Sequence, residues 1–297
     1  MKPNTHRAYQ RRIERVVALL ERAIADGGEL PDLARLAATA NFSPFHFHRI
    51  YRALAGETIG QTVARLRLLR GLRLLSQRDP VTEAALAVGF ETPQAFARAF
   101  RQSLGATPSE LKREPQRLAQ EIERLAKPPQ PDAGTQAPLR VEVVSLEPFR
   151  LAALRNVGDV AELDQAFVRL FEWAGEHGLL DSMLGIYGVP HDDPRDVDPG
   201  AFAFDCALAF EAPVDDAIAA DPHVGIAPLQ LGGGRYARLR HVGAFDALYG
   251  LTDRLLAEWL PESGETLRDA PIHHHYLDDP EQVPEAMRRS DLYLPLQ

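Results

Sequence analysis

Histidines are grouped at two places where a metal ion could bind, namely His46 with His48 and the triplet His273-His274-His275. If the triplet lies on a strand, His273 and His275 share one face while His274 points to the other, so the three rings cannot converge on one ion. His46 and His48 have no cysteine or carboxylate partner at ligand spacing and are better explained as neutral hydrogen-bond partners of phosphate or base. We therefore expect no metal and no cofactor.

Nucleophilic catalysis would need a nucleophile, a base and an orienting group, and the sequence shows no such set. We therefore expect a protein that is not an enzyme. His274 or Asp291 could still activate a water molecule, which keeps hydrolysis of a small electrophile as an alternative. Cys206 is the only cysteine of the 297 residues, so an intrachain disulfide is impossible and secretion gains no support.

Residues 93–104 combine an apolar stripe with a polar face that could recognise DNA. The stripe recurs at helical spacing and consists of Phe96, Ala99, Phe100 and Leu104. The opposite face carries Gln94, Arg98, Arg101 and Gln102. Guanidinium and amide groups on one open face suit the base edges and phosphates of a major groove. An ordinary helical hairpin with a solvated basic face fits this spacing equally well.

Residues 44–55 repeat the same arrangement nearer the N-terminus. Phe47, Ile50, Tyr51 and Leu54 form the packing face, and Phe45, His48, Arg49 and Arg52 form a second face. An aromatic ring such as that of Phe45 could pack on thymine methyl groups, or it could cover the small core from outside.

The elements that must position these side chains are readable as well. Residues 83–88 favour a helix, Gly89 supplies the turn, and Thr92 with Pro93 supplies the start of the next helix. Residues 7–25, 30–40 and 59–77 are also predicted to be helices, the last one long and rich in Arg and Leu. Residues 114–138 continue as a helix and then become rich in proline, which predicts a linker.

The run GFETPQAFARAFRQSLGATPSELKR resembles the second helix-turn-helix of the AraC/XylS transcriptional regulators, through its Gly-Phe turn, its Phe-x-Arg-x-Phe core and its Gly-x-Thr-Pro ending. The resemblance extends over residues 7–113 and implies an all-α double helix-turn-helix domain that binds double-stranded promoter DNA. The base contacts it implies are Phe45, His48 and Arg49 in one major-groove segment and Gln94 and Arg98 in the next. The residue types and helical faces add His46, Arg52 and Arg101 to the expected DNA-binding residues. Two different recognition helices imply an asymmetric operator that spans adjacent major-groove segments, about one turn apart.

Charge divides the chain in the same way. Residues 1–127 hold 21 Lys and Arg against 13 Asp and Glu, a balance of +8, whereas the other 170 residues hold 12 against 29, a balance of −17. The basic part suits a polyanion, and the acidic part suits a small molecule or a protein. No apolar run approaches the roughly 18 residues of a membrane helix, and the N-terminus lacks the core of a signal peptide, so we expect a cytoplasmic protein with no membrane partner.

The acidic part repeats itself at an offset of about 86 residues. Arg155-Asn156-Val157-Gly158 matches Arg240-His241-Val242-Gly243, and Asp205 matches Asp291. Each copy has the pattern strand, strand, helix, strand, strand, which predicts a duplicated α+β fold. The two copies would leave a concave seam where a ligand could bind.

The segments GRYARLRHVG, EWLPESG, HHHYLDDP and DLYLPL resemble the GyrI-like effector domain of Rob-type AraC relatives, over residues 139–297. In that family a buried glutamate two residues before a tyrosine receives lipophilic cations. Here Tyr276 is present, but His274 takes the place of the glutamate, and a mostly neutral imidazole is a poorer partner for a cation. Asp291 could still supply a negative charge at the same seam. The expected ligand-binding residues are Tyr187, His274, Tyr276, Asp291 and Tyr293.

The sequence as a whole predicts a multidomain protein. Residues 1–113 form the DNA-binding domain, residues 114–138 the linker and residues 139–297 the effector domain. We expect a transcriptional regulator, with activation as its outcome, that senses a small lipophilic molecule. RNA polymerase is a further candidate partner, and the alternatives for residues 139–297 are a small-molecule hydrolase and a protein-binding module.

Overall fold

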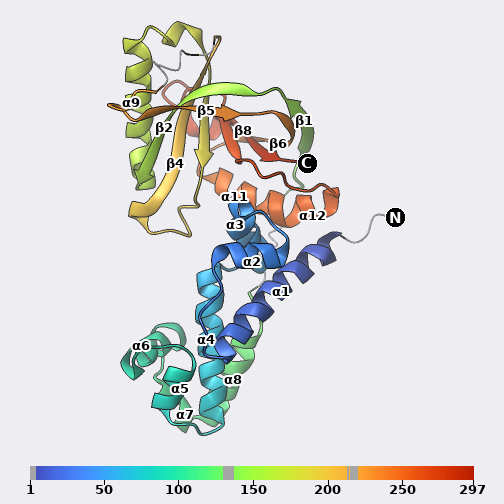
Figure 1. The fold of residues 1–297 in the computed structure, drawn as a ribbon, viewed down its shortest axis with the longest axis vertical. Coiled ribbons are helices and arrows are strands. Elements are labelled where there is room, and N and C mark those ends of the chain that lie inside the picture. The colour runs from blue at the N-terminus through green and yellow to red at the C-terminus, as the bar shows by residue number, and fades with distance from the viewer. Residues whose placement is uncertain (1–4, 130–136, 213, 215–219) are drawn as a thin grey trace. The chain divides into compact units, whose positions relative to one another are not determined.

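The computed structural model describes residues 5–129, 137–212, 214 and 220–297, apart from the side chains of residues 5, 6, 44, 45 and 199. The chain divides into two compact units, Met1–Thr135 and Gln136–Gln297 (Figure 1). The first unit is helical, and the second combines one sheet with helices. The prediction of an all-α region followed by an α+β region is therefore confirmed.

The first unit is built from eight described helices. They are α1 (Thr5–Ala25), α2 (Leu33–Ala40), α3 (Pro44–Ala55), α4 (Ile59–Ser76), α5 (Val81–Ala87), α6 (Pro93–Leu104), α7 (Pro108–Arg113) and α8 (Pro115–Ala126). The side chain of Thr92 accepts a hydrogen bond from the backbone N–H of Ala95 at the start of α6, as its cap position predicts. Gly89 has a φ of 79°, which is the left-handed conformation that the turn between α5 and α6 requires.

The helix α4 runs through two small cores. Its Leu66 packs with Phe47 and Tyr51 of α3 in one core, to which α1 and α2 also contribute. Farther along, Leu72 packs with Phe96 and Phe100 of α6 in the other. The pairs α2–α3 and α5–α6 are therefore two helix-turn-helix units on one connecting helix.

The helix α8 belongs to the second of these cores. Leu118 and Leu125 are buried beside the leucines of α4. The part of the predicted linker that begins at residue 115 is therefore packed into the first unit up to the end of α8. The sequence signal was its amphipathic pattern, which predicts a helix with one face to bury.

The described part of the second unit contains eight strands. They are β1 (Val141–Leu146), β2 (Phe149–Gly158), β3 (Met183–Pro190), β4 (Phe202–Phe210), β5 (Ile226–Leu231), β6 (Gly234–Val242), β7 (His273–Tyr276) and β8 (Arg289–Pro295). They form one antiparallel sheet in the order β1-β6-β8-β7-β3-β4-β2-β5. Its helices are α9 (Leu163–Glu176), α11 (Ala247–Arg254) and α12 (Leu260–Ser263), and a π-helical turn at Leu255–Trp259 joins the last two.

The internal repeat appears directly in this topology. The first strand of each copy pairs with the second strand of the other copy, because β1 lies beside β6 and β5 lies beside β2. Ion pairs repeat as well: Arg155 pairs with Asp205, and Arg240 pairs with Asp291 at the equivalent place. The copies also pair at the middle of the sheet, where β3 lies beside β7, and we call this junction the seam.

The two faces of the sheet are covered differently. On one face, Leu170 and Trp173 of α9 pack against Phe204 and Cys206 of β4, and α9 runs along the sheet in Figure 1. We call this the helix-covered face. The opposite face holds a second apolar cluster built by strand residues such as Leu151, Val189 and Ala207. Among the residues described, no helix has both the length and the apolar character that crossing a bilayer requires.

Candidate functional sites

The helix α6 presents the polar face that the sequence predicts. Gln94, Arg98 and Arg101 are exposed, whereas Phe96 and Phe100 are fully buried in the core of the second helix-turn-helix unit. Gly105, with a φ of 65°, ends the helix directly after this face. The three polar side chains are free to approach the edges of base pairs and the phosphates beside them.

The helix α3 differs from the prediction at two residues. His46 and Arg49 are buried, Arg49 at 4% exposure, and His48 and Arg52 are half-buried. The buried side of α3 is wider than its predicted stripe, because Ile50 and Ala53 are also buried and stand four residues after His46 and Arg49 on the same side of the helix. All four polar side chains make contacts. The side chain of Phe45 lies outside the described residues.

Two of the five expected ligand residues lie together on the helix-covered face, at the seam between the copies. There Ile186 pairs with Tyr276, and Gly188 pairs with His274. A Cβ atom at Gly188 would lie 2.8 Å from the hydroxyl oxygen of Tyr276 and 2.4 Å from the Phe204 ring. Glycine at this position therefore makes room for the Tyr276 side chain over β3.

Rings from three other segments surround Tyr276 and His274. The ring centre of Phe245 is 4.6 Å from that of Tyr276, and the ring of Phe167 on α9 meets it edge-on at 6.1 Å. Tyr249 of α11 meets His274 edge-on at 6.4 Å. Burial, with Tyr249 and Cys206 nearby, raises the pKa of Tyr276 well above its usual value, so its hydroxyl stays protonated. No local pattern in the sequence indicates Phe167, Phe245 and Tyr249 as residues of this site, because only the packing of helices on the sheet brings them to the seam.

The other three expected residues, Tyr187, Asp291 and Tyr293, lie on the opposite face of the sheet. Tyr187 stacks on His275 at 4.3 Å, and Tyr293 stacks on the fully buried His273 at 4.8 Å. The register explains this, because His275, and not His274, pairs with both Tyr187 and Asp291 across the neighbouring strands. The five residues therefore do not line one pocket.

Asp291 is also fully engaged. Its carboxylate is buried and accepts hydrogen bonds from Nε and Nη2 of Arg240. The expectation that Asp291 supplies a charge to the seam is therefore wrong, because the side chain points away from His274 and its charge is already paired. Within the described ranges, no three His, Cys, Asp or Glu side chains are grouped so that they could hold a metal ion.

Comparison with known proteins matches a different family to each of the two units. Residues 36–114 match the helix-turn-helix domain family, and residues 140–297 match the family described as GyrI-like small molecule binding domain. The fold and the sites define a DNA-binding protein with a ligand-binding domain. The chain belongs to the GyrI-like family and carries an AraC-type helix-turn-helix region in front of that domain.

The Probable transcriptional regulator YgiV of Escherichia coli K12 is 32% identical over 163 residues, which cover 54% of this chain and 99% of that protein. The Right origin-binding protein of the same organism is 32% identical over 87 residues, covering 28% of this chain and 29% of that protein. A hydrolase structure from Listeria innocua is 17% identical, with a TM-score of 0.40, and the match covers 54% of this chain and 94% of that one. The chain is a ligand-sensing transcriptional regulator.

Proposed function

We propose that α6 reads promoter DNA through Gln94 and Arg98, with Arg101 at its edge. The observation that supports this is the exposed polar face of α6 on a rigid helix whose opposite face is fully buried. At α3, Phe45, His46, His48, Arg49 and Arg52 remain the predicted contacts of the first major-groove segment. Arg49 reaches bases only once its side chain becomes accessible.

A duplex selected by the full chain from a random pool tests the DNA-binding part. Binding should weaken steeply as salt increases, because phosphate contacts release counterions. Arg98→Ala should cost about 1–3 kcal/mol on the selected duplex if Arg98 contacts a base in bidentate fashion. Arg124→Ala is the matched control, because Arg124 is exposed on α8, away from α6, and forms an ion pair with Glu121 of its own helix. Equal losses on selected and random duplexes would show that Arg98 contacts phosphate alone.

The effector, in our proposal, binds at the seam on the helix-covered face, against Tyr276 and His274. Five rings from β7, α9, α11 and the loop before α11 meet there, which suits a lipophilic molecule. A neutral molecule is preferred over a cation, because Asp291 faces away and His274 stands where relatives have a carboxylate. Tyr187, Asp291 and Tyr293 have no part in this site.

The variant His274→Glu tests both the place and the charge preference. Two dyes serve as probes of the full chain: neutral N-phenylnaphthylamine and cationic rhodamine 6G. The native chain should bind the neutral dye more tightly, and His274→Glu should reverse this order, because it restores a carboxylate beside Tyr276. Tyr187→Phe on the opposite face is the control and should change neither affinity. Unchanged preferences in His274→Glu would place the effector elsewhere.

The proposed outcome is activation through recruitment of RNA polymerase, by a domain that binds its effector without converting it. Transcription from the selected duplex in a purified system should rise when a bound lipophile is added. Recovery of the lipophile unchanged after many equivalents have been offered supports a sensor. Its hydrolysis, abolished by His274→Ala while DNA binding survives, would instead favour the hydrolase alternative.

A further inference from the structure

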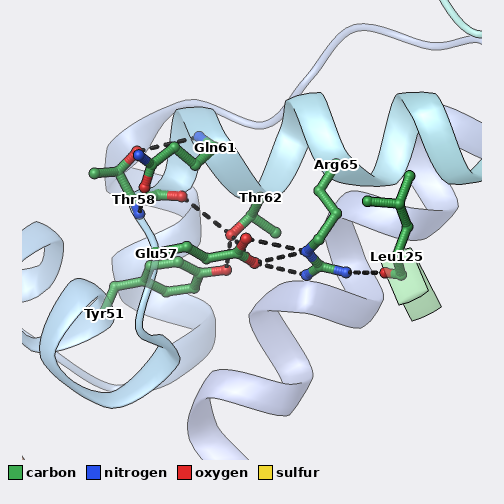
Figure 2. Close-up of polar contacts among 7 residues, drawn as sticks. All are labelled: Tyr51, Glu57, Thr58, Gln61, Thr62, Arg65 and Leu125. Carbon is green, nitrogen blue, oxygen red and sulfur yellow. Dashed lines mark hydrogen bonds and ion pairs between the residues drawn. The ribbon is translucent and has the colours of Figure 1, made fainter. Parts of the chain in front are cut away.

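A chain of buried and partly buried hydrogen bonds connects α3 with the C-terminal end of α8 (Figure 2). The carboxylate of Glu57, which precedes α4, accepts from Nε and Nη2 of Arg65 and from the hydroxyl of Thr62. The Thr62 oxygen is 2.7 Å from the hydroxyl of Tyr51 on α3. On the other side, Nη1 of Arg65 donates to the carbonyl of Leu125 at 2.9 Å.

The direction of each hydrogen bond follows from the chemistry of the groups. An ionised carboxylate only accepts, so Thr62 donates to Glu57 and Tyr51 donates to Thr62. Burial raises the pKa of Tyr51 to about 12, which keeps that donor protonated. Arg65 has a planar fork of donors, and it uses one edge for Glu57 and the remaining nitrogen for Leu125. The Thr62 hydroxyl also lies 3.1 Å from the carbonyl of Thr58, and replacing Thr62 by an apolar residue removes the acceptor 2.7 Å from the buried Tyr51 hydroxyl.

The carbonyl of Leu125 is one of the last in α8, where backbone carbonyls have no partner within the helix. Arg65 supplies that partner across 60 residues of sequence. The ion pair that holds Arg65 in place is itself shielded, since the side chains of Arg65 and Glu57 are 12% and 7% exposed. The end of α8 is thus fixed to the same carboxylate that, through Thr62, holds the Tyr51 hydroxyl.

We propose that Arg65 is a positioning residue that transmits a displacement of the α8 end to α3 through Glu57 and Thr62. This rests on the proposed role of α3 in reading DNA. The helix α6 contacts α8 through the apolar core that Leu125 shares with Phe96 and Phe100, and not through the hydrogen bonds of Arg65, Glu57 and Thr62 described above. A change in the hydrogen bond at residue 125 therefore reaches the first recognition helix through polar contacts, whereas the apolar contacts between α8 and α6 do not depend on Arg65.

Arg70 offers a matched control on the same helix. Its Nη2 donates to the carbonyl of Ala25 at 2.7 Å. Arg70 therefore links the end of α1 to α4, as Arg65 links the end of α8 to α4. The tie at Arg70 is not connected to Tyr51 through Glu57 and Thr62. Both Arg65→Lys and Arg70→Lys weaken a hydrogen bond to a carbonyl at a helix end, and Arg65→Lys also weakens the pair with Glu57, because a lysine ammonium keeps the charge but cannot bond two separate groups with a rigid fork.

Hydrogen–deuterium exchange of the full chain, followed by mass spectrometry, is the test. Arg65→Lys should raise exchange both at the α8 end and in α3, by on the order of tenfold for one lost hydrogen bond. Thr62→Val should raise exchange in α3 alone, and Arg70→Lys should raise it at the α1 end alone. Exchange in α6 should stay at the native rate in all three variants.

Two results would overturn the coupling. One is an Arg65→Lys variant in which only the α8 end loses protection, and the other is a uniform increase over every helix. The exchange measurements need neither DNA nor effector. A chain that selects no duplex would therefore refute the proposed function and leave the coupling through Arg65 unaffected. A selected duplex adds a second test. Scrambling the base pairs that α3 contacts should abolish the difference in affinity between the native and Arg65→Lys chains. Scrambling the base pairs that α6 contacts should preserve that difference.

Discussion

The two equivalent ion pairs of the second unit should differ in their effect on stability. Arg240 and Arg155 each bond a buried aspartate through Nε and Nη2. Asp205 has a further partner, because Nε2 of His191 lies 2.7 Å from its Oδ2. Burial raises the pKa of Asp205, but the hydrogen bonds from Arg155 and His191 outweigh burial and leave the pKa below its usual value. The equivalent of His191 in the second copy is Leu277, which cannot donate.

The structure sets the size of each effect. Breaking a buried pair costs about 3–5 kcal/mol, because it leaves a charge without compensation, whereas exposed pairs contribute about 0–1 kcal/mol. The Arg240 side chain is 46% exposed and that of Asp291 is 3% exposed, so Arg240→Ala falls between these limits at about 2 kcal/mol. Arg155→Ala leaves the His191 bond in place and should cost about half as much, roughly 1 kcal/mol.

Tryptophan fluorescence measures this loss selectively, because both tryptophans, Trp173 and Trp259, belong to the second unit. For a unit of this size, 1 kcal/mol shifts Tm by about 2–4 °C, so Arg240→Ala should lower Tm by about 4–8 °C and Arg155→Ala by about 2–4 °C. Adding His191→Leu to Arg155→Ala should make the two copies equivalent. Equal losses for the two single variants would refute the role assigned to His191.

Three further outcomes are expected. Burial lowers the pKa of His273 to about 3 from 6.5, so the stability that its neutral form provides is complete above about pH 6.5 and is lost as the pH falls toward 3; His273→Phe should flatten this part of a fluorescence-monitored stability curve. Gly188→Ala should destabilise the second unit by about 1–3 kcal/mol, measured by urea unfolding, because its methyl group collides with Phe204 and Tyr276. Asp278 has its pKa lowered to about 2 by hydrogen bonds from Arg289, so Asp278→Asn should remove a stability loss that the native chain shows only as the pH falls from about 4 to 2.

Local signals in the sequence predict the first unit well. The turn at Gly89 and the start of α6 at Thr92 and Pro93 depend on residues within one helical turn of each other, and both are present as predicted. The burial of Arg49 is different. Arg49 lies at the edge of the apolar face of α3, beside Ile50 and Ala53, which are buried. Whether a residue at this edge is buried depends on the helices that pack there, and the sequence of α3 alone does not contain that information.

The second unit shows a different limit. The repeat predicts the pattern of strands, and alternation predicts that His273 and His275 share a face. Alternation within one strand does not show which residues of the neighbouring strand lie on the same face of the sheet, because that depends on the register between the two strands. Placing Asp291 with His275 instead of His274 required the pairing of β7 with β8 and of β7 with β3, and no local pattern in the sequence encodes it.

The duplicated frame is symmetric, but the site proposed at its seam is not. Position 188 of the first copy corresponds to position 274 of the second, and position 190 corresponds to position 276. The first copy has Gly188 and Pro190 where the second has His274 and Tyr276. The Tyr276 side chain lies in the space over β3 that Gly188 leaves open, so one copy provides the side chains and the other provides the room. Because neither glycine nor proline has an aromatic ring or a side-chain hydrogen-bond donor, the seam forms one aromatic site in place of two. The duplication provides the common fold, and the differences between the copies provide the side chains of the site.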